Sequence, residues 1–411
     1  MVHVVFAIPF AMENTLRFAR AAASLPGVRL SVVSQDQPEK FPADFRAQIV
    51  DFELVRDALV ADQLAAGVQT LAARQGPVER LLGVLEPLQE PMAAVRERLR
   101  IRGMDAPTAR NFRDKAHMKE VFRAHDLPCA RHELCANVEQ ARAFASRVGF
   151  PLVGKPPAGA GSKATARCDD LPSLLAFLQQ TRPAPGREVL LEEFVLGREF
   201  SFDTATLHGQ HVFHNVCCYY PTPLEVMENP WIQWAVVLPQ QIDGPEFADI
   251  HRVGPRALAA LGMWTGMSHM EWFRRSNGSI AIGEVAARPP GAQFMTLMSH
   301  VTGVDLYRAF AELMVFETWT PLQRRAAAGC AYLRGQGATG KPGAVVRALH
   351  GVDAVQRELG DLVVEARLPV LGKPPNSSYE GDGFVIVRHP DTRVVTQAVQ
   401  HVVANVRVEL A

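Results

Sequence analysis

The sequence predicts an α/β protein with α+β character, built from several compact units. Three observations support this prediction. The chain has 411 residues, which exceeds the length at which a single hydrophobic core usually stops growing. Its first part alternates apolar, strand-length runs with segments of helical periodicity, and its middle contains two strong β-hairpin patterns. A glycine-rich break at 335–343 introduces a last segment with a helix and a strand.

The composition is that of an ordinary globular protein. Apolar residues make up 48% of the chain and charged residues 21%, and Lys+Arg equals Asp+Glu. With a formal net charge of zero, the chain has no overall positive field that would attract nucleic acid or anionic lipid. No run approaches the ~20 apolar residues of a membrane span, and the start lacks the basic region of a signal peptide. We therefore expect a cytoplasmic protein with neither nucleic-acid nor membrane partners.

The N-terminal segment predicts a Rossmann-like unit. Residues 2–8 form a strand-like run, 12–24 have helical periodicity, and 28–34 form a second strand-like run, which gives a βαβ opening. No Gly-rich dinucleotide fingerprint follows the first strand, so a dinucleotide site is not expected there. Helical segments within 56–100 complete this unit.

The second unit opens with two predicted helices. Asn111 is expected to cap the first helix, with Asp114 reaching back to it. Asn137 is expected to cap the second, which Gly149 ends. The strand 150–155 follows. The predicted boundaries of the four units are 1–108, 109–186, 187–325 and 326–411.

A loop of small residues follows this strand and separates Lys155 from Lys163. Small residues let backbone N–H groups approach a phosphate closely, and lysines supply point charges. The order of residues is not that of a Walker motif. A plain turn with solvated lysines is the alternative. The candidate phosphate-binding residues of this loop are Gly159, Gly161 and Ser162.

A second motif is an apolar strand that ends in acidic residues near 189–199. Its backbone could face an adenine edge while Glu199 accepts a hydrogen bond from a ribose hydroxyl. A strand with a charged rim is the alternative interpretation. The candidate adenine-binding residues are Glu192, Glu193, Phe194 and Val195.

A third motif is the hairpin 268–286, whose turn is predicted at Asn277-Gly278. A two-residue turn there pairs Glu271 with Glu284. Two carboxylates directly opposite each other repel, and Mg²⁺ removes this repulsion because it accepts carboxylate, phosphate and water oxygens. The alternative is a surface hairpin with an unfavourable pair.

The same register pairs Phe273 with Ile282 and His269 with Ala286, all on the face of the two glutamates. Phe273 and Ile282 would form an apolar platform for adenine. If the strand continues, Arg288 lies on this face and directs its guanidinium towards the same place.

Together these motifs resemble the ATP-grasp superfamily, with the match running from about residue 105 to 320. The flanking units resemble its N-terminal pre-ATP-grasp domain and its C-terminal lid-side domain, in a biotin-carboxylase-like fold. Within the superfamily the chain is most similar to carboxylate–amine ligases of the L-amino-acid ligase and carnosine synthase group. The motif residues are Lys115, Lys155, Glu192-Glu193-Phe194-Val195, Glu199, Glu271, Glu284 and Arg288.

The resemblance implies an ATP-dependent ligase that forms a C–N bond through an acyl phosphate and releases ADP and phosphate. Lys115 and Lys155 would contact ATP phosphates, and Glu271 and Glu284 would bind one or two Mg²⁺ ions. The substrates would be a small-molecule carboxylate and amine, and a homodimer is a candidate assembly. The residues implied in catalysis are Arg288, Lys155 and Lys163.

One departure and two rival functions stay open. The family usually has Asn where this chain has Ala286, which would remove a ligand of a second Mg²⁺. A non-catalytic regulatory nucleotide-binding module is therefore one rival. A biotin-carboxylase-type carboxylase is the other, but there the arginine precedes a Val-Glu-His stretch, whereas Arg288 precedes 289–293, Pro-Pro-Gly-Ala-Gln.

Two further segments have no predicted role of their own. On a strand, His211 is expected to face away from His208 and His214, and neither a Cys nor a carboxylate completes a metal-ligand set with them. The aromatic segment 219–234 is compatible with an acceptor pocket or with a packed surface loop.

Overall fold

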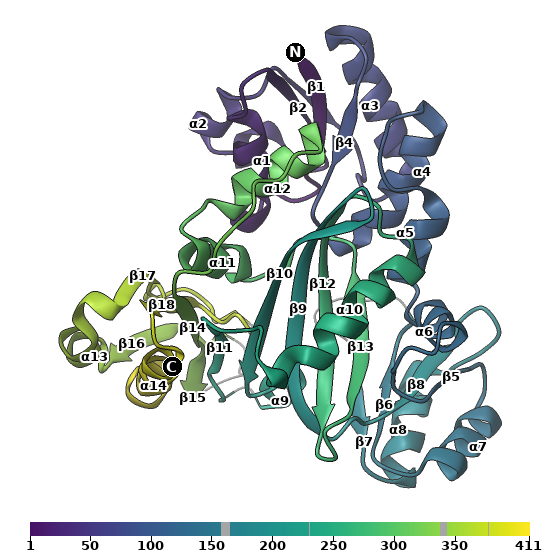
Figure 1. Ribbon diagram of the computed structural model, residues 1–411, viewed down its shortest axis with the longest axis vertical. Helices are drawn as coiled ribbons and strands as arrows, with labels where there is room; N and C mark the ends of the chain where they lie inside the picture. The colour runs from purple at the N-terminus through teal and green to yellow at the C-terminus, as the bar shows by residue number, and fades with distance from the viewer. Residues whose placement is uncertain (158–164, 230, 338–342, 377) are drawn as a thin grey trace.

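The computed structural model describes residues 1–157, 165–229, 231–337, 343–376 and 378–411. Within these residues the strands form four sheets (Figure 1). The loop residues Gly159, Gly161, Ser162 and Lys163 lie outside the described ranges. No helix among the described residues is long and apolar enough to cross a membrane.

The N-terminal unit is a four-stranded parallel sheet with the order β3-β2-β1-β4. Val4 and Phe6 of β1 point into one core, with α1 and with α12 (Leu306–Phe316), while Val5 and Ala7 point into another, with α3 and α4. Burial on both faces explains the continuous apolar run and confirms the Rossmann-like prediction. Its elements are β1 (Val2–Ala7), α1 (Glu13–Ala23), β2 (Val28–Ser34), α2 (Ala43–Arg46), β3 (Asp51–Leu54), α3 (Ala61–Gln75), β4 (Arg80–Leu82) and α4 (Gln89–Leu99).

The second unit is a small antiparallel sheet with the order β5-β8-β6-β7. Gly154, the residue before Lys155, lies where α8 approaches β6 very closely. A Cβ at this position would lie 2.4 Å from the ring of Phe177. Its elements are α5 (Ala106–Arg113), α6 (Lys115–Ala124), β5 (His132–Cys135), α7 (Val138–Val148), β6 (Leu152–Lys155), β7 (Ala166–Cys168), α8 (Leu171–Thr181) and β8 (Val189–Glu193).

One predicted helix start in this unit is wrong. Asn111 lies inside α5, whose cap is Asp105, and Asp114 caps α6 by accepting from the N–H groups of Ala116 and His117. The segment is therefore two helices, because the carboxylate of Asp114 starts a new helix instead of closing the earlier one. The cap of α7 at Asn137 is confirmed.

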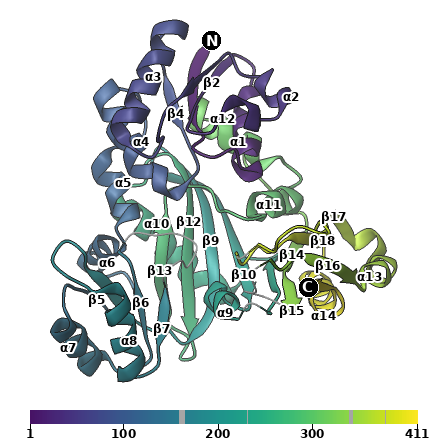
Figure 2. The same ribbon diagram turned by 180° about the vertical axis from the view of Figure 1, so that it is seen from behind.

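The central sheet has the order β13-β12-β9-β10-β11-β14-β18-β17, and all of its pairs are antiparallel. Helix α10 covers one face, and α11 and α12 pack against the opposite face (Figures 1 and 2). Its elements are β9 (Gly197–Leu207), β10 (Gln210–Tyr220), α9 (Pro223–Glu228), β11 (Trp234–Leu238), α10 (Ala248–Leu261), β12 (Gly266–Arg275), β13 (Ile280–Ala286), α11 (Phe294–Thr302) and α12 (Leu306–Phe316).

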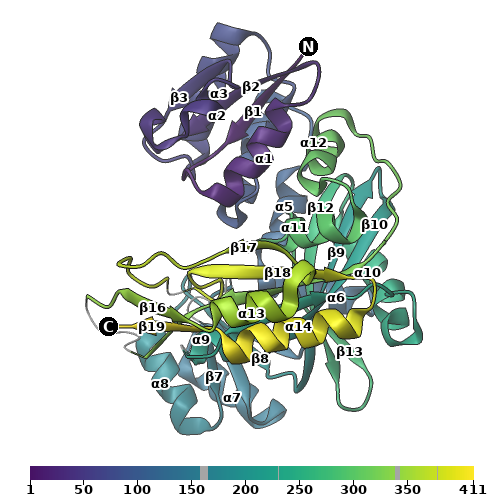
Figure 3. The same cartoon turned by 90° about the vertical axis from the view of Figure 1, so that its left-hand side faces the viewer.

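The C-terminal segment completes this sheet and adds a small one, with the order β15-β19-β16. Helices α13 and α14 lie side by side below the N-terminal unit (Figure 3). The central sheet runs across the predicted boundary at 325/326, and the four-unit division stays a prediction. The C-terminal elements are β14 (Ala327–Leu333), β15 (Gly335–Gly337), β16 (Val346–His350), α13 (Val352–Leu359), β17 (Val363–Arg367), β18 (Gly383–His389), α14 (Thr392–Asn405) and β19 (Arg407–Leu410).

Candidate active site

A cavity of about 420 Å³ is lined by the small sheet, by one end of the central sheet and by α9. This volume lies in the range of small-molecule sites. The predicted site residues that line it are Lys115, Lys155, Glu192, Glu193, Phe194, Val195, Glu199, Glu271, Phe273, Glu284 and Arg288.

The two predicted metal ligands lie directly opposite each other in the hairpin of β12 and β13. Glu271 pairs with Glu284, and His269 pairs with Ala286, as the sequence predicts. Both carboxylates line the cavity. Two like charges at paired positions destabilise a sheet, so their position on a cavity wall favours a cationic partner.

The predicted pairing of Phe273 with Ile282 is wrong. The turn has three residues rather than two, because the Arg275 N–H donates to the Ser279 carbonyl, and a β-bulge at Gly283 then restores the register at the glutamates. Ile282 therefore pairs with Trp272 and lies in the core beneath α10. Phe273 alone lines the cavity, where it packs near Val195.

Lys115 is the first residue of α6 and forms an ion pair with Glu284. Its backbone N–H donates to the Pro157 carbonyl (3.0 Å), which joins α6 to the end of β6. Burial opposes ionisation of Glu284, but the charges of Lys115 and Lys155 outweigh it and lower the pKa of this carboxyl to about 2.

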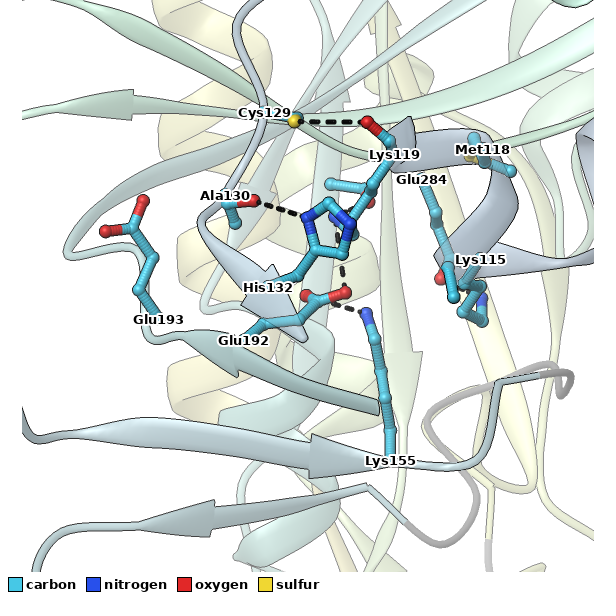
Figure 4. Close-up of polar contacts among 12 residues, drawn as sticks. Lys115, Met118, Lys119, Cys129, Ala130, His132, Lys155, Glu192, Glu193 and Glu284 are labelled. Atoms are coloured by element: carbon cyan, nitrogen blue, oxygen red, sulfur yellow. Dashed lines mark hydrogen bonds and ion pairs between the residues drawn. The ribbon is translucent and has the colours of Figure 1, made fainter. Parts of the chain in front are cut away.

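Glu192 lies buried between two lysines (Figure 4). Lys119 Nζ is 3.2 Å from Glu192 Oε1, and Lys155 Nζ is 3.0 Å from Oε2. Burial raises the pKa of this carboxyl, but the two lysines outweigh burial and lower it. Lys119 also donates to the carbonyl of Gly283, the bulged residue (2.8 Å). The Glu192 side chain is therefore engaged by the two lysines. At this position the backbone, rather than the side chain, would contact adenine.

Glu193 and Phe194 are also held by cationic side chains. Glu193 accepts from Arg131 Nε (2.7 Å) and forms an ion pair with Arg275. The Arg167 guanidinium lies 4.5 Å from the ring centroid of Phe194. These contacts fix the end of β8 where it enters the cavity wall.

Glu199 adds a third carboxylate to the wall. It is buried on β9, and its strand partner on β12 is Phe273. Burial first, and then the charges of Glu271 and Glu284, raise the pKa of Glu199 well above its usual range. A cation bound beside these carboxylates would reverse that effect.

Arg288 follows β13 and lines the cavity. Its Nε donates to Glu86 Oε2 (2.6 Å), and its Nη1 donates to the Pro289 carbonyl (3.0 Å). Glu86 comes from the N-terminal unit, so a contact between units fixes the direction of the guanidinium.

His269 lies between two acidic residues. Its Nδ1 is 2.6 Å from Asp203 Oδ1, and its Nε2 is 3.8 Å from Glu271 Oε1. Burial lowers the pKa of this imidazole, but Asp203 and Glu271 outweigh it and raise the pKa to about 9. Asp203 also accepts from Ser201 and Asn215, both at 3.1 Å.

The cavity reaches both flanks of the small-residue loop and the aromatic segment. Pro156 and Thr165 line it on either side of 158–164. The part of 219–234 that faces the cavity includes Tyr219, Glu225 and Trp234.

Sequence reasoning missed Lys119, Glu86 and Asp203. Lys119 follows Lys115 by four residues, so helical spacing places both on one face of α6. Asp203 is two residues from Ser201 on β9, so both lie on the same face of this strand, and Asp203 is paired with His269 on β12. No local pattern could have found Glu86, because its partner Arg288 is 202 residues away.

Comparison with known proteins shows which domain and which fold this chain resembles. Residues 120–303 match the family model of the ATP-grasp domain. The L-amino acid ligase from Bacillus licheniformis superposes with a TM-score of 0.78 at 16% identity, covering 99% of this chain and 98% of that one. The biotin carboxylase domain of a Hydrogenobacter thermophilus 2-oxoglutarate carboxylase gives 0.72 at 16% identity, covering 99% and 90%. Residues 120–303 therefore match an ATP-grasp domain, and the chain has the ATP-grasp fold, as expected from the sequence.

The sequence comparison adds a relative with a specific name. The L-arginine-specific L-amino acid ligase of Bacillus subtilis is 23% identical over 247 residues, which are 59% of each protein. The chain thus spans about three fifths of the length of that relative.

Proposed function

We propose that the chain is an ATP-dependent carboxylate–amine ligase that works through an acyl phosphate and releases ADP and phosphate. One observation carries this proposal: Glu271 and Glu284, paired across a hairpin, face the same cavity as Lys155 and Arg288. Phosphoryl transfer from ATP needs this combination of metal-binding carboxylates and cations around the phosphates. The similarity to L-amino acid ligases supports the proposal that the acceptor is an amine.

ATP would lie across the cavity with its adenine on an apolar wall. Ala130, Val195 and Phe273 contribute to this wall, and Glu199 is near enough to the wall to serve the ribose. Lys115 and Lys155 would contact the phosphates. Both form ion pairs with carboxylates of the cavity wall, which fix their positions.

The residues present fit a divalent cation. Three carboxylates, Glu199, Glu271 and Glu284, line one region, and burial together with the charges of the other two raises the pKa of Glu199. Glu271 and Glu284 would hold Mg²⁺, which supplies charge neutralisation for the phosphates. Ala286 offers no ligand atom, so we propose that these two glutamates are the protein ligands for one or two ions.

The chain's own residues would act on the charge that develops during transfer. A substrate carboxylate oxygen bonds to the γ-phosphorus of ATP while the bond from that phosphorus to the β–γ bridging oxygen breaks, and ADP leaves. Arg288 and Lys155 would stabilise the negative charge on the transferring group. The amine nitrogen then bonds to the acyl carbon, phosphate leaves, and the nitrogen loses a proton. Lys163 and its loop, outside the described residues, would cover the triphosphate and limit attack by water.

The carboxylate and amine substrates would occupy the end of the cavity formed by 219–234. Tyr219, Trp234 and Phe294 line this end and contact one another. This arrangement favours the acceptor-pocket interpretation of the segment. A homodimer and a cytoplasmic location, where ATP is available, are parts of this proposal.

The test is carboxylate-dependent ATP turnover with hydroxylamine as the nucleophile. A panel of amino acids should give hydroxamate together with equal amounts of ADP and phosphate. Glu284→Gln should reduce this yield by about 10²-fold or more. AMP and pyrophosphate as products would overturn the mechanism. ATP binding without turnover for any acid would favour the regulatory module, and ADP formation that requires bicarbonate would favour the carboxylase.

A further inference from the structure

A second group of potential metal ligands lies away from this cavity, on the face of the central sheet that α10 covers. His214 on β10, His251 on α10 and Asp243 between β11 and α10 bring one ligand atom each within 4.8 Å of one another. His214 Nε2 is 3.8 Å from Asp243 Oδ1, and the two imidazole centroids are 4.6 Å apart. None of the three lines the active-site cavity.

The fold brings these residues together through two local features. A β-bulge between His211 and Phe213 shifts the register of β10, so His214 lies opposite Thr204. Helix α10 approaches the sheet closely at Gly254, where a Cβ would lie 2.6 Å from the Phe202 ring. His251 is three residues earlier on the same helix face and therefore also points towards the sheet.

The bulge also corrects a prediction. His211 and His214 pair with Thr206 and Thr204, which share one face of β9, so His211 does not face away from His214. The sequence around His214 does not complete a metal-ligand set. In the fold, Asp243 and His251 lie where they can complete a ligand set with His214.

The two histidines present the protonation state that binds metal. Burial lowers the pKa of both, and the charge of the neighbouring His251 lowers that of His214 further. Neutral imidazole carries the lone pair that a metal requires. His251 Nε2 is buried and has no hydrogen-bond partner among the described residues. A buried ring nitrogen without a partner costs free energy unless a ligand satisfies it.

We propose that His214, Asp243 and His251 bind a divalent transition metal ion of the Zn²⁺ class. Two imidazoles and one carboxylate, with water in the remaining position, are a ligand set typical of Zn²⁺, whereas Mg²⁺ takes oxygen ligands. With bonds of about 2.1 Å, ligand atoms around a tetrahedral ion lie roughly 3.4 Å apart, so side-chain shifts of about 1 Å close the site.

The bound ion would join α10 to β10 and to the connection that carries Asp243. Arg324 is the neighbouring cation, and it lowers the pKa of His214. Its Nη1 donates to Asn215 Oδ1 (2.8 Å) and its Nε to the Gln240 carbonyl (3.2 Å). The positive charge of Arg324 therefore repels a bound cation, but its guanidinium does not occupy the position of a ligand.

The test is Zn²⁺ titration of the metal-free full chain by calorimetry, with excess Mg²⁺ present to occupy the acidic residues of the active site. We expect one Zn²⁺ per chain. His251→Gln and Asp243→Asn should each lower Zn²⁺ affinity by at least about tenfold. His211→Gln, on the same strand face, is the matched control and should leave the affinity unchanged. Co²⁺ in place of Zn²⁺ should give ligand-field absorption that the same two variants lose.

Thermal unfolding separates binding from misfolding. The Asp243 side chain is 88% exposed, so Asp243→Asn should leave the unfolding temperature of the metal-free chain unchanged. Zn²⁺ should raise that temperature in the unaltered chain but not in this variant. Equal Zn²⁺ affinity in all variants, or no stoichiometric binding by the unaltered chain, would overturn the site. Neither result bears on carboxylate-dependent ADP formation.

Discussion

Lys119 Nζ lies 3.2 Å from Glu192 Oε1, and the two side chains are only 0% and 7% exposed. This buried pair joins α6 to β8, and Lys119 extends it to β13 through the Gly283 carbonyl. Glu192 also holds Lys155, the lysine proposed to contact ATP phosphates. Four elements of the cavity wall, α6, β6, β8 and β13, therefore meet at this cluster.

Lys119→Met should destabilise the protein and weaken ATP binding. Removing one partner of a buried ion pair leaves an under-compensated charge, which costs about 3 kcal/mol of unfolding free energy. Urea unfolding would measure this loss, and nucleotide titration would measure the affinity. Arg123→Met, an exposed position on the same helix, is the control. Similar values for both variants would show that the cluster does not organise the wall.

Substitutions of Phe273 and Ile282 should affect different properties, the KM for ATP in the first case and the stability in the second. Ile282→Val removes a methylene from the core and should cost about 1 kcal/mol of stability while leaving the KM for ATP unchanged. Phe273→Ala should raise the KM for ATP several-fold because Phe273 lines the cavity. Steady-state kinetics and urea unfolding of both variants test this contrast. A raised KM in the Ile282 variant would argue against its place in the core.

The His269–Asp203 pair should make metal-free stability depend on pH. The folded pKa of His269 is about 9, above the ordinary 6.5, so the pair stabilises fully below 6.5 and this stabilisation disappears as pH rises through about 9. The loss should reach about 3 kcal/mol at most. Urea unfolding on both sides of this window measures it. His269→Gln should flatten the profile, and an unchanged slope in that variant would contradict the assignment.

Glu86→Gln should impair turnover more than ATP binding. Glu86 orients the guanidinium of Arg288, which is proposed to act on charge that develops in the transition state. We expect kcat to fall by about tenfold, with the KM for ATP changed less than about twofold. Glu90→Gln, an exposed position nearby, is the control. A change in KM alone would indicate a role in nucleotide binding instead.

The sequence was most informative where contacts are local. The βαβ opening and the cap at Asn137 were predicted from spacing alone, because period and capping depend on neighbours within a few residues. The Glu271–Glu284 pair was predicted for a similar reason, since one turn fixes the register of a hairpin. The same count failed at Ile282, because the bulge at Gly283 compensates for the longer turn only from the glutamates onward.

By itself the sequence determined the fold class, the ATP-grasp resemblance and the residue types that face the cavity. The tertiary structure decided which partners those residues have. Arg288 meets Glu86 across 202 residues, and His214 meets His251 only because α10 approaches the sheet closely at Gly254. Local periodicity fixes the direction of a side chain within its own helix or strand. The group that it meets depends on how separate elements dock, and docking is set by packing of the whole chain.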